Sequence, residues 1–341
     1  MDITVNADFE EQLRTFLIAN CGLNPSEDKY KNLLKLDTYE IARKFLYDFR
    51  TNPKTLGQRV HYSKELLESE DYKIFKNEIH NIENIFNNSL DITPYLSKKA
   101  KNRFGNSKKD TLLTAWNINH IHLKPLTGVP NTNNEMIACL ITYNDVYFIS
   151  IIRHGDWGKL DMLKIIRDNW PKCMPLLKYN GEYQMVLNDG TNIEQKEKEL
   201  LELRENGCST MIELDGEMYS QIITSSKDSI KDINFLNNLF DDYRLTRTLL
   251  EENRQRIFKT ILKLNGKPQK PAFSFKWLKP LEIRAELYEE YSKLNFFVYK
   301  DAITKGFFAI IGNSKKAYKI ELTLTPHSTT HQTHPQQNEQ V

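Results

Sequence analysis

Two histidines separated by one residue lie in a short apolar segment near the middle of the chain. The segment Trp116–Pro125 reads W-N-I-N-H-I-H-L-K-P. Side chains alternate between the two faces of a β-strand, so His120 and His122 share one face, and the isoleucine and leucine that follow them lie on the other. Imidazole has an ordinary pKa of about 6.5, so it can accept or donate a proton at neutral pH. The segment therefore predicts a strand with one apolar face and one face suited to acid–base or metal chemistry.

A third histidine, His154, follows a second strand-like segment. Residues 135–143 (EMIACLITY) and residues 146–152 (VYFISII) are both apolar and are separated by an Asn-Asp turn signal. Three strands joined in this order form an antiparallel meander, in which the first and third strands flank the second. Counting by twos from Phe148 puts His154 on the face of Phe148. That count does not decide whether this is also the face of His120.

Three chemical interpretations of these histidines compete. In the first, His120, His122 and His154 cleave RNA without a metal, with imidazoles as acid and base and with Lys124 or Arg153 binding phosphate. In the second, the histidines bind Zn²⁺ or Mn²⁺ and leave one coordination position open for water. In the third, they are packed polar side chains that bond to the backbone. The first interpretation requires no cofactor.

The densest positive run in the chain comes just before the histidine strand. Residues 97–109 read S-K-K-A-K-N-R-F-G-N-S-K-K. Lysine and arginine neutralise phosphates, so the run predicts a surface that binds nucleic acid. The alternative is a linker that its charges keep solvated. The basic residues of the run are Lys98, Lys99, Lys101, Arg103, Lys108 and Lys109.

A weaker candidate site lies further along the chain. Glu213, Asp215 and Glu217 alternate in a segment that reads as a hairpin, and alternating carboxylates can bind a metal ion. Asp215 is better explained as a turn residue, because Asp-Gly is a strong hairpin signal. Phosphate-binding glycine loops and the common hydrolase motifs are absent from the sequence, which argues against those classes of protein.

Helices in the first third of the chain are expected to support this region. Apolar residues recur at i, i+3, i+4 and i+7 in residues 9–20, 38–49 and 71–88, which is typical of amphipathic helices. Residues 1–108 are therefore predicted to form a helical N-terminal region.

Residues 109–228 are predicted to form a central domain that contains the histidines. Asp110 is a suitable N-cap for a short helix before the histidine strand, and Pro171 prevents a later helix from continuing. The other predicted elements of the domain are a helix over 159–169, a strand over 182–189, a helix over 192–207 that ends at Gly207, and a hairpin over 208–220.

The last third of the chain is predicted to begin with a long helix. Residues 229–264 carry an apolar stripe at helical spacing, with Asp228 or Ser229 as the N-cap, and residues up to 325 return to a mixture of helix and strand. Residues 326–341 are rich in histidine, glutamine and threonine and are expected to be disordered.

Composition limits the classes of partner and the location. The 341 residues include 47 Lys and Arg and 45 Asp and Glu, so the global charge balance gives no case for a polyanionic partner. Four cysteines without a C-x-x-C motif and an acidic N-terminal segment predict a reduced, cytoplasmic protein. The longest apolar runs fall short of the roughly 20 residues that a membrane helix needs, so no membrane partner is expected.

Three segments resemble a known group of proteins. LLTAWNINHIHL, VYFISIIRHGDW and IIRDNWP are similar to uncharacterised bacterial proteins often associated with mobile elements, which have an H-x-H-L strand, a Y-F-I strand ending in His and an N-W-P helix end. The likeness covers about residues 110–230 and implies no established activity. That group has a glycine-rich segment after the Asp-Gly hairpin, where this sequence has SQIITSSKDS.

We therefore expect an α+β protein with a helical N-terminal region, a central antiparallel β-meander with flanking helices, and a mixed α/β C-terminal portion. The leading functional hypothesis is an RNA-cleaving protein of a toxin or phage-defence type, with RNA as substrate and an antitoxin or another protein as partner. The alternatives are a non-catalytic interaction or structural protein of a bacterial mobile element and a metal-dependent hydrolase. An enzyme requires the three imidazoles to converge where solvent reaches them, whereas a scaffold allows them to be buried and dispersed.

Overall fold

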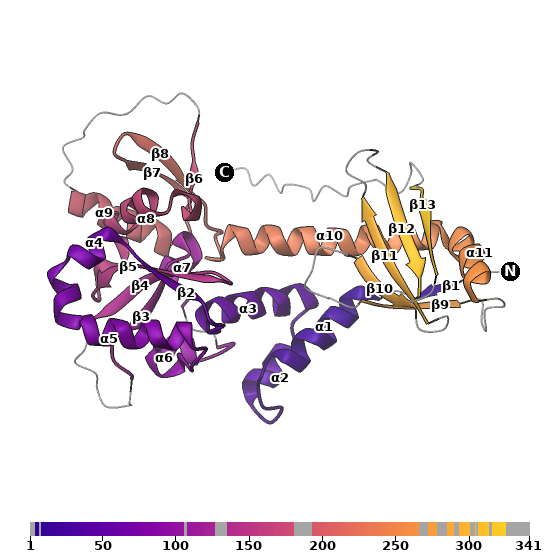
Figure 1. The fold of residues 1–341 in the computed structure, drawn as a ribbon, viewed down its shortest axis with the longest axis horizontal. Coiled ribbons are helices and arrows are strands. Elements are labelled where there is room, and N and C mark those ends of the chain that lie inside the picture. The colour runs from indigo at the N-terminus through magenta and orange to yellow at the C-terminus, as the bar shows by residue number, and fades with distance from the viewer. Residues whose placement is uncertain are drawn as a thin grey trace, which may run out of the picture. The chain divides into compact units, whose positions relative to one another are not determined.

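The computed structural model describes residues 4–6, 8–105, 108–126, 135–180, 193–265, 272–277, 285–289, 293–300, 304, 306–313 and 316–324. The chain divides into two compact units. The terminal unit comprises Met1–Asn24, Leu36–Ala42 and Phe235–Val341, and the histidine unit comprises Pro25–Lys35 and Arg43–Asn234. Both units combine helices with β-sheet (Figure 1), so the predicted α+β class is confirmed.

The terminal unit contains a six-stranded sheet in the order β1-β9-β10-β11-β12-β13. Its neighbours pair antiparallel, except for β1, which runs parallel to β9. The strands are β1 (Thr4–Asn6), β9 (Ala272–Trp277), β10 (Ala285–Glu289), β11 (Leu294–Lys300), β12 (Phe307–Gly312) and β13 (Ala317–Leu322). The helices are α1 (Phe9–Asn20), α10 (Ile230–Glu252, from Phe235 on) and α11 (Arg254–Asn265).

The long helix predicted over 229–264 is interrupted at Asn253, which separates α10 from α11. The Asn253 side chain donates to the Thr323 carbonyl (2.9 Å) and accepts from the Thr323 amide (3.0 Å). These bonds connect the helix break to the chain just after β13. Because the partner lies 70 residues away, helical periodicity gives no sign of the break.

The histidine unit is built around a four-stranded sheet in the order β2-β5-β4-β3. Its strands are β2 (Arg59–Tyr62), β3 (Asn119–His122), β4 (Met136–Ile141) and β5 (Asp145–Ile152). A three-stranded sheet, in the order β6-β8-β7, consists of β6 (Leu177–Lys178), β7 (Thr210–Leu214) and β8 (Glu217–Gln221). The α-helices are α2 (Asp28–Leu34), α3 (Thr38–Thr51, from Arg43 on), α4 (Lys64–Glu68), α5 (Glu70–Asn87), α6 (Lys98–Lys101), α7 (Thr111–Trp116), α8 (Asp161–Asn169) and α9 (Ile193–Glu205). The 3-10 helices are η1 (Thr93–Tyr95), η2 (Asp156–Gly158) and η3 (Pro171–Cys173).

The antiparallel meander β3-β4-β5 matches the prediction, and β2 adds an unexpected fourth strand. β2 lies in the region predicted to be helical and pairs parallel to β5. Ser63, which follows β2, donates its hydroxyl to the Ile149 carbonyl on β5 (2.6 Å). The same oxygen accepts from the Leu66 amide (3.0 Å) and so caps α4. One serine therefore joins the edge of the sheet to the helix that follows it.

Each face of the four-stranded sheet is covered by its own apolar core. On one face, Ile121 and Phe148 pack with residues of α5, such as Ile82 and Phe86. The core on the other face includes residues of the sheet, α7, α8, α9 and the β7–β8 hairpin. Side chains on both faces of β3 and β5 are therefore either packed or enclosed.

Three predicted segments lie outside the described residues: the polar loop at 127–134, the strand at 182–189 and the tail at 326–341. Among the helices that the structure describes, none combines the length and the apolar character needed to span a bilayer.

Candidate functional site

The histidine strand has the two faces that its sequence predicts. β3 pairs with β4 in the register His120↔Ala138 and His122↔Met136. Ile121, between the two histidines, is buried in the core that includes α5. His120 and His122 therefore lie on the opposite face.

A β-bulge in β5 decides where the third histidine lies. The β4–β5 pairing shifts register between Ala138 and Cys139, which leaves Ile149 as an extra residue on β5. Phe148, before the bulge, packs in the core with α5, whereas Ile152, after it, packs in the core on the other face. Counting by twos from Phe148 therefore puts His154 on the wrong face of the sheet, because the extra residue of the bulge inverts the alternation of side chains.

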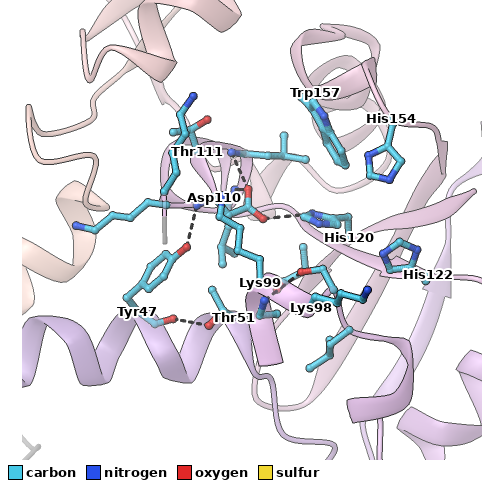
Figure 2. Close-up of a pocket in the computed structure, with 18 of the residues that line it drawn as sticks. Tyr47, Thr51, Lys98, Lys99, Asp110, Thr111, His120, His122, His154 and Trp157 are labelled. Carbon is cyan, nitrogen blue, oxygen red and sulfur yellow. Dashed lines mark hydrogen bonds and ion pairs between the residues drawn. The ribbon is translucent and has the colours of Figure 1, made fainter. Parts of the chain in front are cut away.

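Beyond the bulge, the side chain of Ile152 lies on the same face of the sheet as His120 and His122. Ile152 pairs with Met136, and Met136 pairs with His122. His154 follows Ile152 by two residues, and its ring centroid lies 6.4 Å from that of His122. The structure thus brings together the histidines of the first strand and the histidine after the third (Figure 2).

Asp110 lies beside the first histidine. As N-cap of α7, its Oδ1 accepts from the amides of Leu112 (3.1 Å) and Leu113 (3.2 Å). Its Oδ2 lies 3.3 Å from Nδ1 of His120, but the two atoms do not have hydrogen-bond geometry, and Nδ1 of His120 has no hydrogen-bond partner among the described residues. The Asp110 amide donates to the Tyr47 hydroxyl (2.8 Å), which connects this end of α7 to α3. The sequence predicts the capping role of Asp110 but gives no sign of its pairing with His120.

Trp157 contacts two of the three imidazoles. It lies in η2, with its ring centroid 4.9 Å from that of His120 and 5.6 Å from that of His154. Gly158, the next residue, packs against α9 so closely that an added Cβ would lie 2.6 Å from the Glu197 carbonyl oxygen. This close approach fixes η2 against α9 and Trp157 beside the histidines.

A buried arginine supports the same tryptophan. Arg204 on α9 is 0% exposed, its guanidinium lies 4.4 Å from the ring centre of Trp116, and its Nη2 donates to the Trp157 carbonyl. Burial lowers the pKa of Arg204 to about 10, opposed by the negative charges of Asp110 and Glu205, so the guanidinium stays charged at neutral pH. Arg204 therefore anchors the backbone of the residue that contacts His120 and His154.

The three imidazoles differ in exposure. His122 is only 7% exposed, the His120 side chain is 17% exposed, and His154 is exposed. Burial, followed by the neighbouring charges of His120, His154 and Lys101, lowers the pKa of His122 to about 4. His122 is therefore neutral at physiological pH. Its Nδ1 is buried and has no hydrogen-bond partner among the described residues.

The imidazoles open into a cavity of about 500 Å³ that is lined by elements from across the histidine unit. Lys98 and Lys99 of α6 line it and are exposed. Within the part of the chain that the structure describes, no carboxylate pairs with either lysine. The cavity therefore combines three imidazoles with two available positive charges (Figure 2).

Most other basic residues of the predicted nucleic-acid run have protein partners. Lys108 pairs with Glu205 (2.8 Å), and Lys101 donates to the Pro94 carbonyl (3.2 Å). Arg103 and Lys109 pair with buried aspartates, Asp48 and Asp228. Only part of the run is therefore available to an anion.

The two residues predicted to bind phosphate beside the histidines lie elsewhere. Lys124 is 3.8 Å from Glu78, and Arg153 pairs with Asp71 (2.8 Å) and Glu135 (3.7 Å). Neither is among the described residues that line the cavity. Lys98 and Lys99 line the cavity in their place.

The geometry does not favour the metal interpretation. No three histidine, cysteine, aspartate or glutamate side chains among the described residues are arranged so that they could bind one metal ion. Glu213, Asp215 and Glu217 are also otherwise engaged: Glu213 accepts from the Gly216 amide (2.8 Å), and the other two form ion pairs.

Comparisons with protein-family models, with curated proteins and with solved structures each gave no match. The resemblance noted from the sequence stays a prediction, and the functional interpretation rests on the residues of the cavity.

Proposed function

We propose that this protein cleaves RNA by imidazole acid–base catalysis that requires no metal ion. The observation that supports the proposal is the convergence of His120, His122 and His154 with the unpaired Lys98 and Lys99 on one cavity. RNA carries its own nucleophile, the 2′-hydroxyl, so cleavage needs a base, an acid and positive charge around the phosphorus.

His120 is assigned the role of general base. The Asp110 carboxylate lies beside Nδ1, where it stabilises the imidazolium that forms, and Nε2 is left for the substrate. Nε2 takes the proton of the 2′-hydroxyl while O2′ forms a bond to phosphorus.

His154, on the second side of the site, is assigned the role of general acid. It gives a proton to O5′ as the P–O5′ bond breaks, which leaves a 2′,3′-cyclic phosphate and a 5′-hydroxyl. His122 is neutral at physiological pH and donates a hydrogen bond to a phosphate oxygen. Lys98 and Lys99 stabilise the negative charge of the phosphorane. Such an activity suits a toxin or phage-defence protein that a partner protein inhibits.

The test is to incubate the purified protein with total RNA, with and without EDTA, and to identify the cleaved ends. We expect cleavage that survives EDTA, yields 2′,3′-cyclic phosphate ends and falls by about 10² to 10⁴ in His154→Ala. His154 is exposed, so its removal should leave folding intact. His80→Ala is the matched control, because His80 is an exposed histidine on α5 that does not line the cavity.

Three outcomes would contradict the proposal. Loss of cleavage in EDTA would favour a metal-dependent hydrolase. Equal activity of the His154→Ala and His80→Ala proteins would mean that His154 is not the general acid. The absence of cleavage under every condition would favour the non-catalytic interaction protein.

A further inference from the structure

A second cavity adjoins the histidine cavity. It has a volume of about 250 Å³ and shares several lining residues with the first, among them Tyr47, Thr51, Lys99 and Ala100. The second cavity is therefore open to a ligand that extends beyond the histidine cavity.

The second cavity is strongly basic. Five basic side chains and two carboxylates line it, so a formal positive charge remains after pairing. The basic residues are Arg43, Lys44, Lys99, Arg103 and Lys109, and the carboxylates are Asp48 and Asp228.

Its two carboxylates bind three of these five cations. Asp48 accepts from Nε (2.9 Å) and Nη2 (2.6 Å) of Arg103. Asp228 pairs with Arg43 (2.6 Å) and with Lys109. Both carboxylates are buried, with side chains 6% and 4% exposed, so they orient the cations from behind.

Lys44 and Lys99 are left without an acidic partner among the residues that the structure describes. The positive charges of Arg43 and Lys44 help to lower the pKa of Lys109, after the larger effect of burial. A bound anion would relieve this repulsion between cations. The free charge of the cavity is therefore suited to a phosphate.

An aromatic ring lies beside these charges. Phe104 lines the cavity in a left-handed backbone conformation (φ 54°), which non-glycine residues rarely adopt. The Arg103 guanidinium carbon lies 5.6 Å from the centre of its ring, and Asp48 holds that arginine. Aromatic rings beside basic residues are the usual means by which proteins bind the bases of single-stranded nucleic acid.

We propose that the second cavity is a subsite for a nucleotide beyond the two that flank the cleaved bond, so that the substrate is single-stranded RNA that occupies both cavities. Lys44 binds the phosphate of that nucleotide, and the base of the nucleotide stacks on Phe104. This inference rests on the proposed RNA cleavage and specifies the form of the substrate.

The test compares the cleavage of a dinucleotide with that of a single-stranded hexanucleotide. We expect Lys44→Ala to lower kcat/KM roughly tenfold for the hexanucleotide and to leave the dinucleotide unchanged, because one charged contact is lost. Lys44→Arg should restore cleavage of the hexanucleotide. Phe104→Leu should show the same dependence on length through lost stacking. Lys76→Ala, on the exposed surface of α5, is the matched control.

The outcomes separate this inference from the proposed function. If Lys44→Ala changes kcat/KM equally for both substrates, or for neither, the proposed subsite is wrong, whereas the proposal of RNA cleavage is unaffected. If the wild-type protein cleaves neither substrate, the proposed function fails, and binding of a 2′-O-methyl hexanucleotide then decides the subsite. Equal affinity of the wild-type and Lys44→Ala proteins would overturn it. A slope of log affinity against log salt concentration that is smaller by about 0.7 in the Lys44→Ala protein would support the subsite.

Discussion

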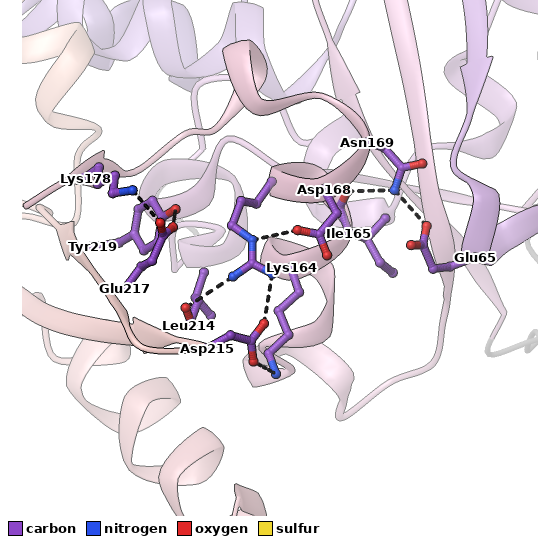
Figure 3. Close-up of polar contacts among 11 residues, drawn as sticks. Glu65, Lys164, Ile165, Asp168, Asn169, Lys178, Leu214, Asp215, Glu217 and Tyr219 are labelled. Carbon is purple, nitrogen blue, oxygen red and sulfur yellow. Dashed lines mark hydrogen bonds and ion pairs between the residues drawn. The ribbon is translucent and has the colours of Figure 1, made fainter. Parts of the chain in front are cut away.

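The histidine cavity and the polar cluster on the β7–β8 hairpin use similar residue types in opposite ways. In the hairpin cluster, Asp215 pairs with Lys164 (2.9 Å) and Arg167 (2.8 Å). Glu217 pairs with Lys178 and accepts from the Tyr219 hydroxyl (2.7 Å) (Figure 3). Each of these charged groups thus has an opposite charge as its partner.

In the histidine cavity, some polar groups lack such partners among the described residues. Lys98 and Lys99 face the cavity without a carboxylate, and Nδ1 of His122 has no hydrogen-bond partner in the described structure. A buried polar group without a partner, such as Nδ1 of His122, costs stability unless a ligand satisfies it. Clustering of charged residues alone therefore does not mark a functional site. Better candidates are clustered polar groups that line a cavity and lack hydrogen-bond or ion-pair partners.

The largest expected effect comes from the contact between Asp110 and His120. Asp110→Asn keeps the oxygen that caps α7 but replaces the charged oxygen beside His120 with an amide. We expect kcat for RNA cleavage to fall by about 10² or more with little change in melting temperature. Asp8→Asn is the matched control, because Asp8 also caps a helix, α1. Equal effects of the two substitutions would mean that Asp110 acts only as a cap.

The next effect is a dependence of stability on pH through His122. Its pKa falls from 6.5 to about 4 on folding, mainly because of burial. Between these values the unfolded chain binds the proton and the folded protein does not, so stability falls as pH decreases from about 6.5 to about 4. We expect wild type to lose up to about 3 kcal/mol more than His122→Gln over this range in chemical unfolding. If the free energy of unfolding depends on pH equally in the two proteins, His122 is not held neutral by burial in the folded state.

A smaller effect tests the contrast between paired and unpaired lysines. Replacing Lys98 and Lys99 together by alanine should lower kcat/KM for RNA roughly tenfold, because the phosphorane loses its positive partners, and should lower the slope of log affinity against log salt concentration by about 0.7 per lost contact. Replacing Lys164 and Lys178 together removes the same charge from the hairpin cluster and should leave both quantities unchanged. If the two double variants behave alike, net charge rather than the cavity controls binding.

The smallest effect is expected in the hairpin cluster itself. Asp215→Ala removes the ion pairs with Lys164 and Arg167 at a position with φ 51°. We expect a modest fall in melting temperature and unchanged RNA cleavage, because solvent-exposed ion pairs contribute little to stability. A large loss of cleavage would show that the hairpin cluster is more than structural.

The local sequence determined much of the fold. Asp110 caps α7, Pro171 follows the end of α8, and the Asp215–Gly216 turn connects β7 to β8. The alternation around Ile121 placed both strand histidines on one face. These features depend on interactions within a few residues, such as a side-chain cap, a fixed φ or a pleat, so a single sequence is enough to predict them.

Tertiary structure alone decided the site. The bulge at Ile149 placed His154 beside His122, and Asp110 came to pair with His120 through the packing of α7 on the sheet. Carboxylates far along the chain removed some of the predicted cations: Asp48 lies 55 residues from Arg103, and Asp228 lies 119 from Lys109. Which charges stay unpaired is decided by contacts that close long loops of chain. Local propensity contains no information about those contacts. Residue types and spacing therefore indicated the kind of chemistry, and the tertiary contacts determined which residues are placed to perform it.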